Sequence, residues 1–217
     1  MKLFSFWRSL ATFRVRIALN LKGLEPEVVD VDLLKGQQRN PDFRAVNPQM
    51  LIPALVDDGR VLFQSLAILE FLDEIRPDPP LLPRLPHDRA RVRALAQIVA
   101  CDAHPLIVPR VRNFLDGEFK LDEPQRLTWI RHWIAEALVA LETHVSRDPQ
   151  TGRYCHGDSI TLADICLVSH AVGAKLFDVD VVPYPTVARI VDTCLKDAAF
   201  ARAHPLNQPG APKSAAH

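Results

Sequence analysis

The chain has 217 residues, of which 48% are hydrophobic and 24% are charged, an ordinary composition for one large or two modest cores. Basic and acidic residues number 26 each, so the formal net charge is zero, which argues against a nucleic-acid or acidic-membrane partner. No apolar run approaches the roughly 18 residues of a membrane-spanning helix. The four cysteines are dispersed, which is typical of reduced thiols in a cytoplasmic protein.

The first part of the chain alternates between strand and helix patterns. Residues 2–6 form a β-rich run, and residues 13–19 carry apolar side chains at helical spacing, with Gly23 as a helix C-cap. Residues 27–32 then alternate as in a strand. We therefore predict a β-α-β arrangement, the minimal parallel unit.

A hairpin and a further helix complete this half. After a polar stretch, an apolar strand begins at Pro53 and ends at the turn signal 57–60. Residues 61–63 form the partner strand of the hairpin. A helix opens at Ser65 and ends near Arg76. The predicted order is β-α-β-(α)-β-β-α.

A proline-rich stretch from Pro77 to Pro86 marks a change of pattern and is a candidate interdomain linker. Beyond it the apolar spacing is helical, as in 92–99 and 127–141. Thr161 and Asp164 form a capping box that starts a buried helix. We expect domains at residues 1–80 and 87–205, followed by a disordered tail at 206–217.

Hydrolytic, phosphate-binding and metal-binding signatures are missing, so we predict no metal site. One candidate for chemistry is the turn from Trp7 to Thr12, because a helix N-terminus offers free amides to an anion such as a thiolate. Ser9 and Thr12 could each donate a hydroxyl hydrogen bond to it. Alternatively, either side chain serves only as a helix cap.

Two other short motifs can hold a peptide-like ligand. A cis bond at Ile52-Pro53 would leave the N–H and C=O of Ile52 unpaired by the sheet. Ser65, following Gln64 at the start of a helix, could offer its hydroxyl and amide to a carboxylate.

Taken together, these motifs resemble the glutathione transferase superfamily, and in detail its zeta class, the maleylacetoacetate and maleylpyruvate isomerases. The similarity covers residues 1–205. It rests on Arg8-Ser9 before 14–19, on Asn47-Pro48 with Ile52-Pro53, and on Gln64-Ser65. The resemblance implies an α/β thioredoxin-like N-terminal domain, an all-α C-terminal domain, glutathione as cofactor and a homodimer.

The resemblance also implies residue roles in glutathione binding. Ile52 would pair with the cysteinyl backbone through cis-Pro53, and Gln64 and Ser65 would hold the γ-glutamyl group. Gln38 would reach the glycyl end. Where the zeta motif runs Ser-Ser-Cys-Ser, this chain has Ser9-Leu10-Ala11-Thr12. Activation of the thiolate would then rest on Ser9, on the amides of Leu10 and Ala11, and on Thr12.

The reaction implied is cis–trans isomerisation of a maleyl diketo acid, a dianion that needs cationic partners. Arg8 adjoins the expected sulfur site and is the first candidate for binding this dicarboxylate. The resemblance adds His104 and Arg110, with Lys175 as a further candidate. His104 could instead be a structural hydrogen-bonder and Arg110 part of a solvated face. On an unbroken helix His104, Arg110 and Arg112 could not all face one cleft, so bringing them together requires a bend at Pro105 or Pro109.

Two other functions fit the same residues. A general glutathione transferase or α-halo-acid dehalogenase would use the same thiolate but consume glutathione. A glutathione-binding scaffold protein of low activity would follow from the change at Leu10-Ala11. The sequence does not separate maleylacetoacetate from maleylpyruvate as substrate.

Overall fold

A computed structural model describes residues 1–212 and divides the chain into two units. The first unit joins Met1–Leu81 to the segment from Lys196 onward, and the second is Leu82–Leu195. Among the described residues, no helix is both long and apolar enough to cross a bilayer.

The first unit contains the alternating elements that the sequence predicts. In chain order they are β1 (Lys2–Ser5), α1 (Leu10–Leu21), β2 (Glu27–Asp30), the 3-10 helix η1 (Gln37–Arg39), α2 (Pro41–Val46), β3 (Ala54–Asp57), β4 (Arg60–Phe63) and α3 (Ser65–Ile75). The sheet order is β2-β1-β3-β4, with β1 and β2 parallel and the other pairs antiparallel. This confirms the thioredoxin-like α/β prediction.

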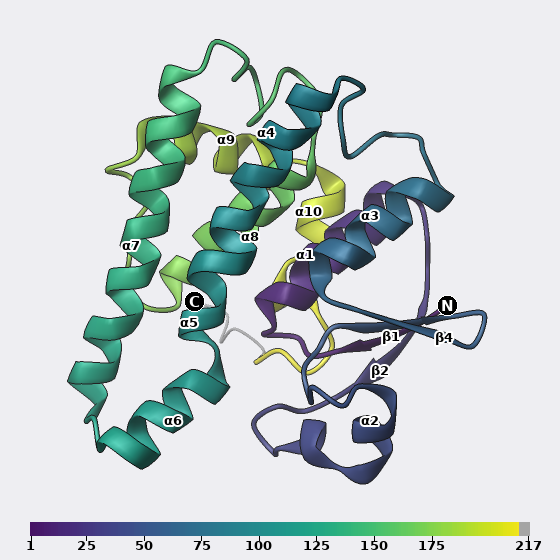
Figure 1. Ribbon diagram of the computed structural model, residues 1–217, viewed down its shortest axis with the longest axis vertical. Coiled ribbons are helices and arrows are strands. Elements are labelled where there is room, and N and C mark those ends of the chain that lie inside the picture. Colours follow the sequence, from purple (N-terminus) through teal and green to yellow (C-terminus); the bar gives the residue numbers. More distant parts are fainter. Residues whose placement is uncertain (213–217) are drawn as a thin grey trace. The chain divides into compact units, whose positions relative to one another are not determined.

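Helices cover both faces of this sheet (Figure 1). Helices α1 and α3 pack together on one face, where Phe13, Ile68 and Leu72 are fully buried. Helix α2 covers the other face, and its Phe43 joins a cluster with Phe6 and Ile52. Apolar side chains of these helices are buried against the sheet and against neighbouring helices, which explains the layered arrangement.

The second unit is entirely helical in secondary structure, as predicted. Its elements are α4 (Pro86–Gln97), the π-helical segment η2 (Ile98–Ala103), α5 (His104–Ile107), α6 (Pro109–Phe119), α7 (Glu123–Arg147), α8 (Leu162–Lys175) and α9 (Pro185–Leu195). The predicted capping box starts α8: Asp164 accepts hydrogen bonds from the N–H and hydroxyl of Thr161, both at 2.8 Å. The other oxygen of Asp164 accepts from the N–H of Cys155 at 2.7 Å.

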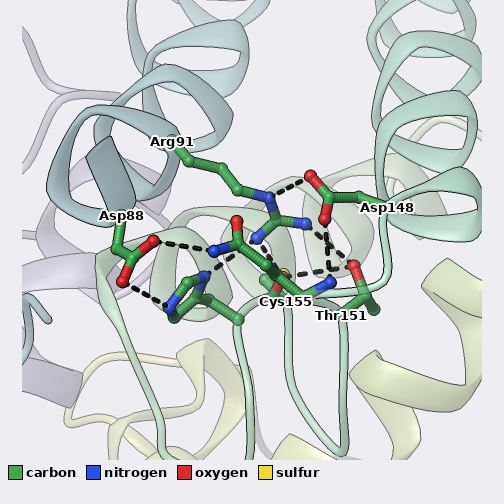
Figure 2. Close-up of polar contacts among 7 residues, drawn as sticks. Asp88, Arg91, Asp148, Thr151 and Cys155 are labelled. Atoms are coloured by element: carbon green, nitrogen blue, oxygen red, sulfur yellow. Dashed lines mark hydrogen bonds and ion pairs between the residues drawn. The ribbon is translucent and has the colours of Figure 1, made fainter. Parts of the chain in front are cut away.

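An arginine on α4 holds the long connection between α7 and α8 (Figure 2). Arg91 donates to Asp148 at 2.6 Å, to the Cys155 carbonyl at 2.7 Å and to Thr151 at 2.9 Å. It also lies 3.3 Å from Nδ1 of His156. Because a guanidinium only donates, this Nδ1 is the acceptor and the ring proton is on Nε2.

The end of the chain differs from the predicted boundaries. Helix α10 (Ala198–Ala203) was expected in the helical domain, but it packs against α1 in the first unit. Arg16 and Asn20 of α1 donate to carbonyls of α10 at 3.0 and 2.9 Å. These contacts join residues about 180 apart in sequence, which local periodicity does not reveal.

The predicted disordered tail, 206–217, also differs from the structure over the residues that the structure describes. A 3-10 helix, η3, spans Pro205–Asn207, and Gln208 donates to the carbonyls of Arg202 and His204. Residues 213–217 lie outside the described part of the chain. The chain beyond α10 is therefore fixed to the first unit as far as Gln208.

Candidate active site

The register of the sheet places several strand ends in one row. Phe4 of β1 lies opposite Ala54 of β3, and Ala54 lies opposite Phe63 of β4. In the parallel pair, Ser5 lies beside Asp30 at the end of β2. Because paired strands are only about 4.8 Å apart, the segments that continue from these ends emerge along one edge of the sheet.

The sequence-predicted residues of the first unit all lie in those segments. They are Arg8, Ser9, Leu10, Ala11 and Thr12 after β1, Gln38 after β2, Ile52 and Pro53 before β3, and Gln64 and Ser65 after β4. The fold therefore places at one edge residues that are up to 57 positions apart in the sequence, from Arg8 to Ser65.

The turn after β1 leads into the N-terminus of α1. Ser9 is the N-cap, and its Oγ accepts from the N–H of Thr12 at 3.2 Å and from the Thr12 hydroxyl at 3.0 Å. Thr12 is completely buried, whereas Ser9 is half-buried and Arg8 is exposed. In the described part of the chain, the N–H groups of Leu10 and Ala11 make no backbone hydrogen bond, so they remain available to an anion.

A residue outside the predicted site, Arg16, fixes the path of this turn. Its guanidinium donates to Ser5 Oγ at 3.3 Å and to the carbonyls of Phe6 at 3.3 Å and Trp7 at 3.2 Å. Burial lowers the pKa of Arg16 to about 10, so the group stays charged at neutral pH. The sequence signal that could have identified Arg16 is a charged residue placed among the apolar residues 13–19 of a predicted helix.

Ile52 presents the backbone groups that the sequence predicts. The Ile52-Pro53 peptide bond is cis, and both residues are buried. In the part of the chain that is described, neither the N–H nor the C=O of Ile52 makes a backbone hydrogen bond. These two groups can therefore pair with an extended peptide-like ligand.

The loop before Ile52 contains two further residues that the sequence reasoning missed. Asn47 is buried, donates to the Leu51 carbonyl at 2.7 Å and accepts from the N–H of Gln49 at 3.1 Å. The side chain of Gln49 then accepts from Nε2 of Gln64 at 3.2 Å. With its amide nitrogen held by Gln49, Gln64 has its carbonyl oxygen left to accept from a ligand ammonium group.

Ser65 is shifted by one position from its expected place. The N-cap of α3 is Gln64, with φ of 69°, and Ser65 is the first residue of the helix. Its amide is therefore one of the unpaired first-turn N–H groups, and its side chain is buried at 7% exposure. A carboxylate at this helix N-terminus would be bound by amide, hydroxyl and dipole together.

Gln38 lies in η1, and its side-chain oxygen is buried without a hydrogen bond among the described residues. A buried acceptor without a donor is costly, so this oxygen favours a ligand that brings an N–H group. The described residues contain no cluster of three or more His, Cys, Asp or Glu side chains that could hold a metal ion.

The remaining candidates lie in the second unit. His104 begins α5 and is half-buried, and Arg110 is an exposed residue of the first turn of α6. The two helices are separated at Val108, whose ψ of 158° is extended. The required interruption is therefore present, directly before Pro109, where the proline ring disfavours helical geometry in the preceding residue.

Lys175 is exposed at the last position of α8. Just beyond it, the ring of Phe177 lies 5.6 Å from the guanidinium carbon of Arg112, a cation–π distance. Within the helical unit, the structure therefore associates the end of α8 with Arg112 rather than with Arg110. Arg110, and not Arg112, was the residue of this helix that the sequence favoured as a substrate ligand.

Comparison with known proteins agrees with this arrangement. Residues 1–74 match the family described as glutathione S-transferase, N-terminal domain, the part that carries the Ser9, Ile52 and Gln64 segments. A crystal structure described as maleylacetoacetate isomerase from Methylobacterium extorquens with bound malonate and glutathione has a TM-score of 0.96 at 53% identity. The match covers 98% of this chain and 100% of that one.

Curated relatives extend the similarity over nearly the whole sequence. The maleylpyruvate isomerase of a Ralstonia species is 45% identical, over 96% of this chain and 99% of the relative. The maleylacetoacetate isomerase of Pseudomonas aeruginosa is 42% identical, over 98% of this chain and 99% of the relative. A holo maleylpyruvate isomerase structure described as zeta class has a TM-score of 0.95 at 44% identity. This chain belongs to the zeta class of the glutathione transferase family.

Proposed function

We propose that this chain is a glutathione-dependent cis–trans isomerase that converts a maleyl diketo acid, maleylacetoacetate or maleylpyruvate, into its fumaryl isomer. The observation that carries the proposal is the alignment of three segments at one sheet edge: the Ser9 turn, the unpaired Ile52 backbone and the Ser65 helix start. The names of relatives more than 40% identical over nearly their full length support the substrate class.

Each segment has a role that follows from its chemistry. The N–H and C=O of Ile52 bind the peptide backbone of glutathione, and Gln64 and Ser65 bind its γ-glutamyl end. Gln38 accepts from the glycyl amide. When bound, glutathione supplies a thiolate that adds reversibly to the cis double bond and so permits rotation about it.

The residues around the sulfur favour its ionised form. A free thiol titrates near pH 8.5, and helix-terminal amides with a hydroxyl donor lower that value. Ser9 and the amides of Leu10 and Ala11 provide these donors.

Our candidates for binding the carboxylates of the substrate are Arg8, His104, Arg110 and Lys175. We also propose a cytoplasmic homodimer that acts in aromatic-acid catabolism, as the family resemblance implies.

The test follows the absorbance of the cis enol of each substrate, with and without glutathione, while free thiol is titrated. We expect rapid loss of absorbance that requires glutathione, with thiol concentration constant, and the faster substrate identifies the physiological one. Consumption of thiol would instead indicate a transferase or an α-halo-acid dehalogenase. A rate no greater than that of glutathione alone would overturn the proposal.

A further inference from the structure

The hydrogen bonds that Ser9 accepts within the turn leave its hydroxyl proton free to be donated to a group outside the turn. A serine hydroxyl has two acceptor lone pairs and one donor proton. Ser9 Oγ accepts from the N–H of Thr12 at 3.2 Å and from the hydroxyl of Thr12 at 3.0 Å. Both acceptor positions are thus filled from within the protein, and the proton remains for a partner outside the turn.

The reverse arrangement, with Ser9 donating to Thr12, is disfavoured by burial. Thr12 has 0% exposure, and in the described part of the chain its hydroxyl makes no hydrogen bond other than that to Ser9. If Ser9 donated inward, the hydroxyl proton of Thr12 would be buried without an acceptor, which costs about 1–3 kcal/mol. The same burial keeps Thr12 from reaching a ligand.

We propose that Thr12 is a positioning residue that directs the hydroxyl proton of Ser9 toward the sulfur of bound glutathione. Donation by Thr12 fixes the rotamer of Ser9 and polarises its O–H group, which strengthens the bond that Ser9 donates. This inference rests on the proposed function, because it takes glutathione as the ligand of the turn. It divides the two candidate hydroxyls into Ser9, which contacts sulfur, and Thr12, which acts through Ser9.

The experiment measures the pKa of the glutathione thiol in the binary complex, from the ultraviolet absorbance of the thiolate as pH is varied. Thr12→Val keeps the shape of the side chain and removes its hydroxyl. We expect the thiol pKa to rise by about one unit, which lowers the ratio of thiolate to thiol roughly tenfold at any given pH. Thr12→Ser retains the hydroxyl and should restore the wild-type value.

Binding of S-methylglutathione, which has no ionisable thiol, reports on the integrity of the site. Its Kd should be the same in the wild type and in Thr12→Val, because the Ile52 and Ser65 contacts are untouched. If Thr12→Val does not fold, Thr12→Ala provides the same comparison with a smaller side chain, and S-methylglutathione binding again verifies the site.

A double-mutant cycle tests whether Thr12 acts through Ser9. In a Ser9→Ala background, Thr12→Val should produce no further rise in the thiol pKa. An undiminished rise in that background, or an unchanged pKa in Thr12→Val alone, would overturn the inference. Failure of the wild type to bind S-methylglutathione would overturn the proposed cofactor itself. Thiolate formation without isomerisation would overturn only the proposed reaction.

Discussion

Asp148 shows how one carboxylate is held in its charged form by neighbours from two directions. Its Oδ1 accepts from the N–H of Gln150 at 2.8 Å, and its Oδ2 accepts from Arg91 at 2.6 Å (Figure 2). The backbone donor of Gln150 and then the Arg91 side chain lower the pKa of Asp148 below its usual value of 3.8. The connection between α7 and α8 therefore has a stability that depends on pH.

The sign of this dependence follows from the lowered pKa. The unfolded chain binds a proton at Asp148 at a higher pH than the folded chain does, so the stabilisation is complete above pH 3.8 and is lost as pH falls through the folded pKa. We expect Asp148→Asn to lower the free energy of unfolding at pH 7 by about 1 kcal/mol, since the side chain is partly exposed. Urea unfolding from pH 7 to pH 3 should show the difference shrinking at the acid end.

Asp102→Asn, at an exposed position of the same unit, controls for loss of charge and should change stability by less than about 0.5 kcal/mol. A difference between wild type and Asp148→Asn that grows toward pH 3 would contradict the assignment.

Individual residues were predictable where their chemistry is local. Ser9 could be identified from its place before an apolar helix, and Ser65 from its place after a strand, although its cap position was off by one residue. Gln49 could not be identified from the sequence, because its hydrogen bond to Gln64 joins residues 15 positions apart. That bond also depends on the path of the loop, which Asn47 fixes. The roles proposed for Ser9 and Thr12 rest on the burial of Thr12, which the sequence does not reveal.

At the scale of elements, helix α1 both packs in the first unit and presents its N-terminal amides at the candidate active site. Its N-terminus begins with Leu10 and Ala11, where the zeta pattern has serine and cysteine. Leu10 is buried at 8% exposure, so its side chain contributes to packing, while its N–H remains unpaired among the described residues. The helix therefore retains the backbone donors of the family with two fewer polar side chains.

Replacing Leu10 by Ser and Ala11 by Cys separates the isomerase from the low-activity scaffold. If backbone amides and Ser9 suffice, kcat should change by less than about threefold, which is below 1 kcal/mol in the barrier. Removal of the buried Leu10 side chain should cost about 2 kcal/mol of stability. Ala11→Cys alone is the matched control, since it leaves the core intact. A large gain in rate at unchanged glutathione affinity would favour the scaffold instead.

Elements were predictable wherever apolar spacing is regular. The order of strands and helices over residues 1–76 follows from periods of two and of about 3.6 residues, and the structure confirms it. The interruption between α5 and α6 was anticipated from Pro105 and Pro109. The π-helical segment before it was not, because a change from i−4 to i−5 bonding leaves no signature in apolar spacing.

At the scale of the whole molecule, the chain ends in the unit in which it begins. After the helical unit, α10 returns to α1, and Phe200 has no exposed surface. Arg16 links the two segments directly, since one guanidinium contacts both the Ala203 carbonyl and the carbonyls before Ser9. The C-terminal segment therefore supports the turn on which the proposed chemistry depends.

Phe200→Ala tests this support. A cavity in place of a fully buried aromatic ring should cost about 3–5 kcal/mol of stability. The loss of stability should be confined to the first unit. Trp7 lies in that unit, whereas Trp129 and Trp133 lie in the second. With both of the latter replaced by Phe, the fluorescence of Trp7 during urea unfolding reports on the first unit alone. Leu206→Ala, in the same segment but 58% exposed, is the matched control. If both variants unfolded at the same urea concentration as their parent, α10 would be dispensable to the first unit, and Arg16 alone would have to hold the Ser9 turn.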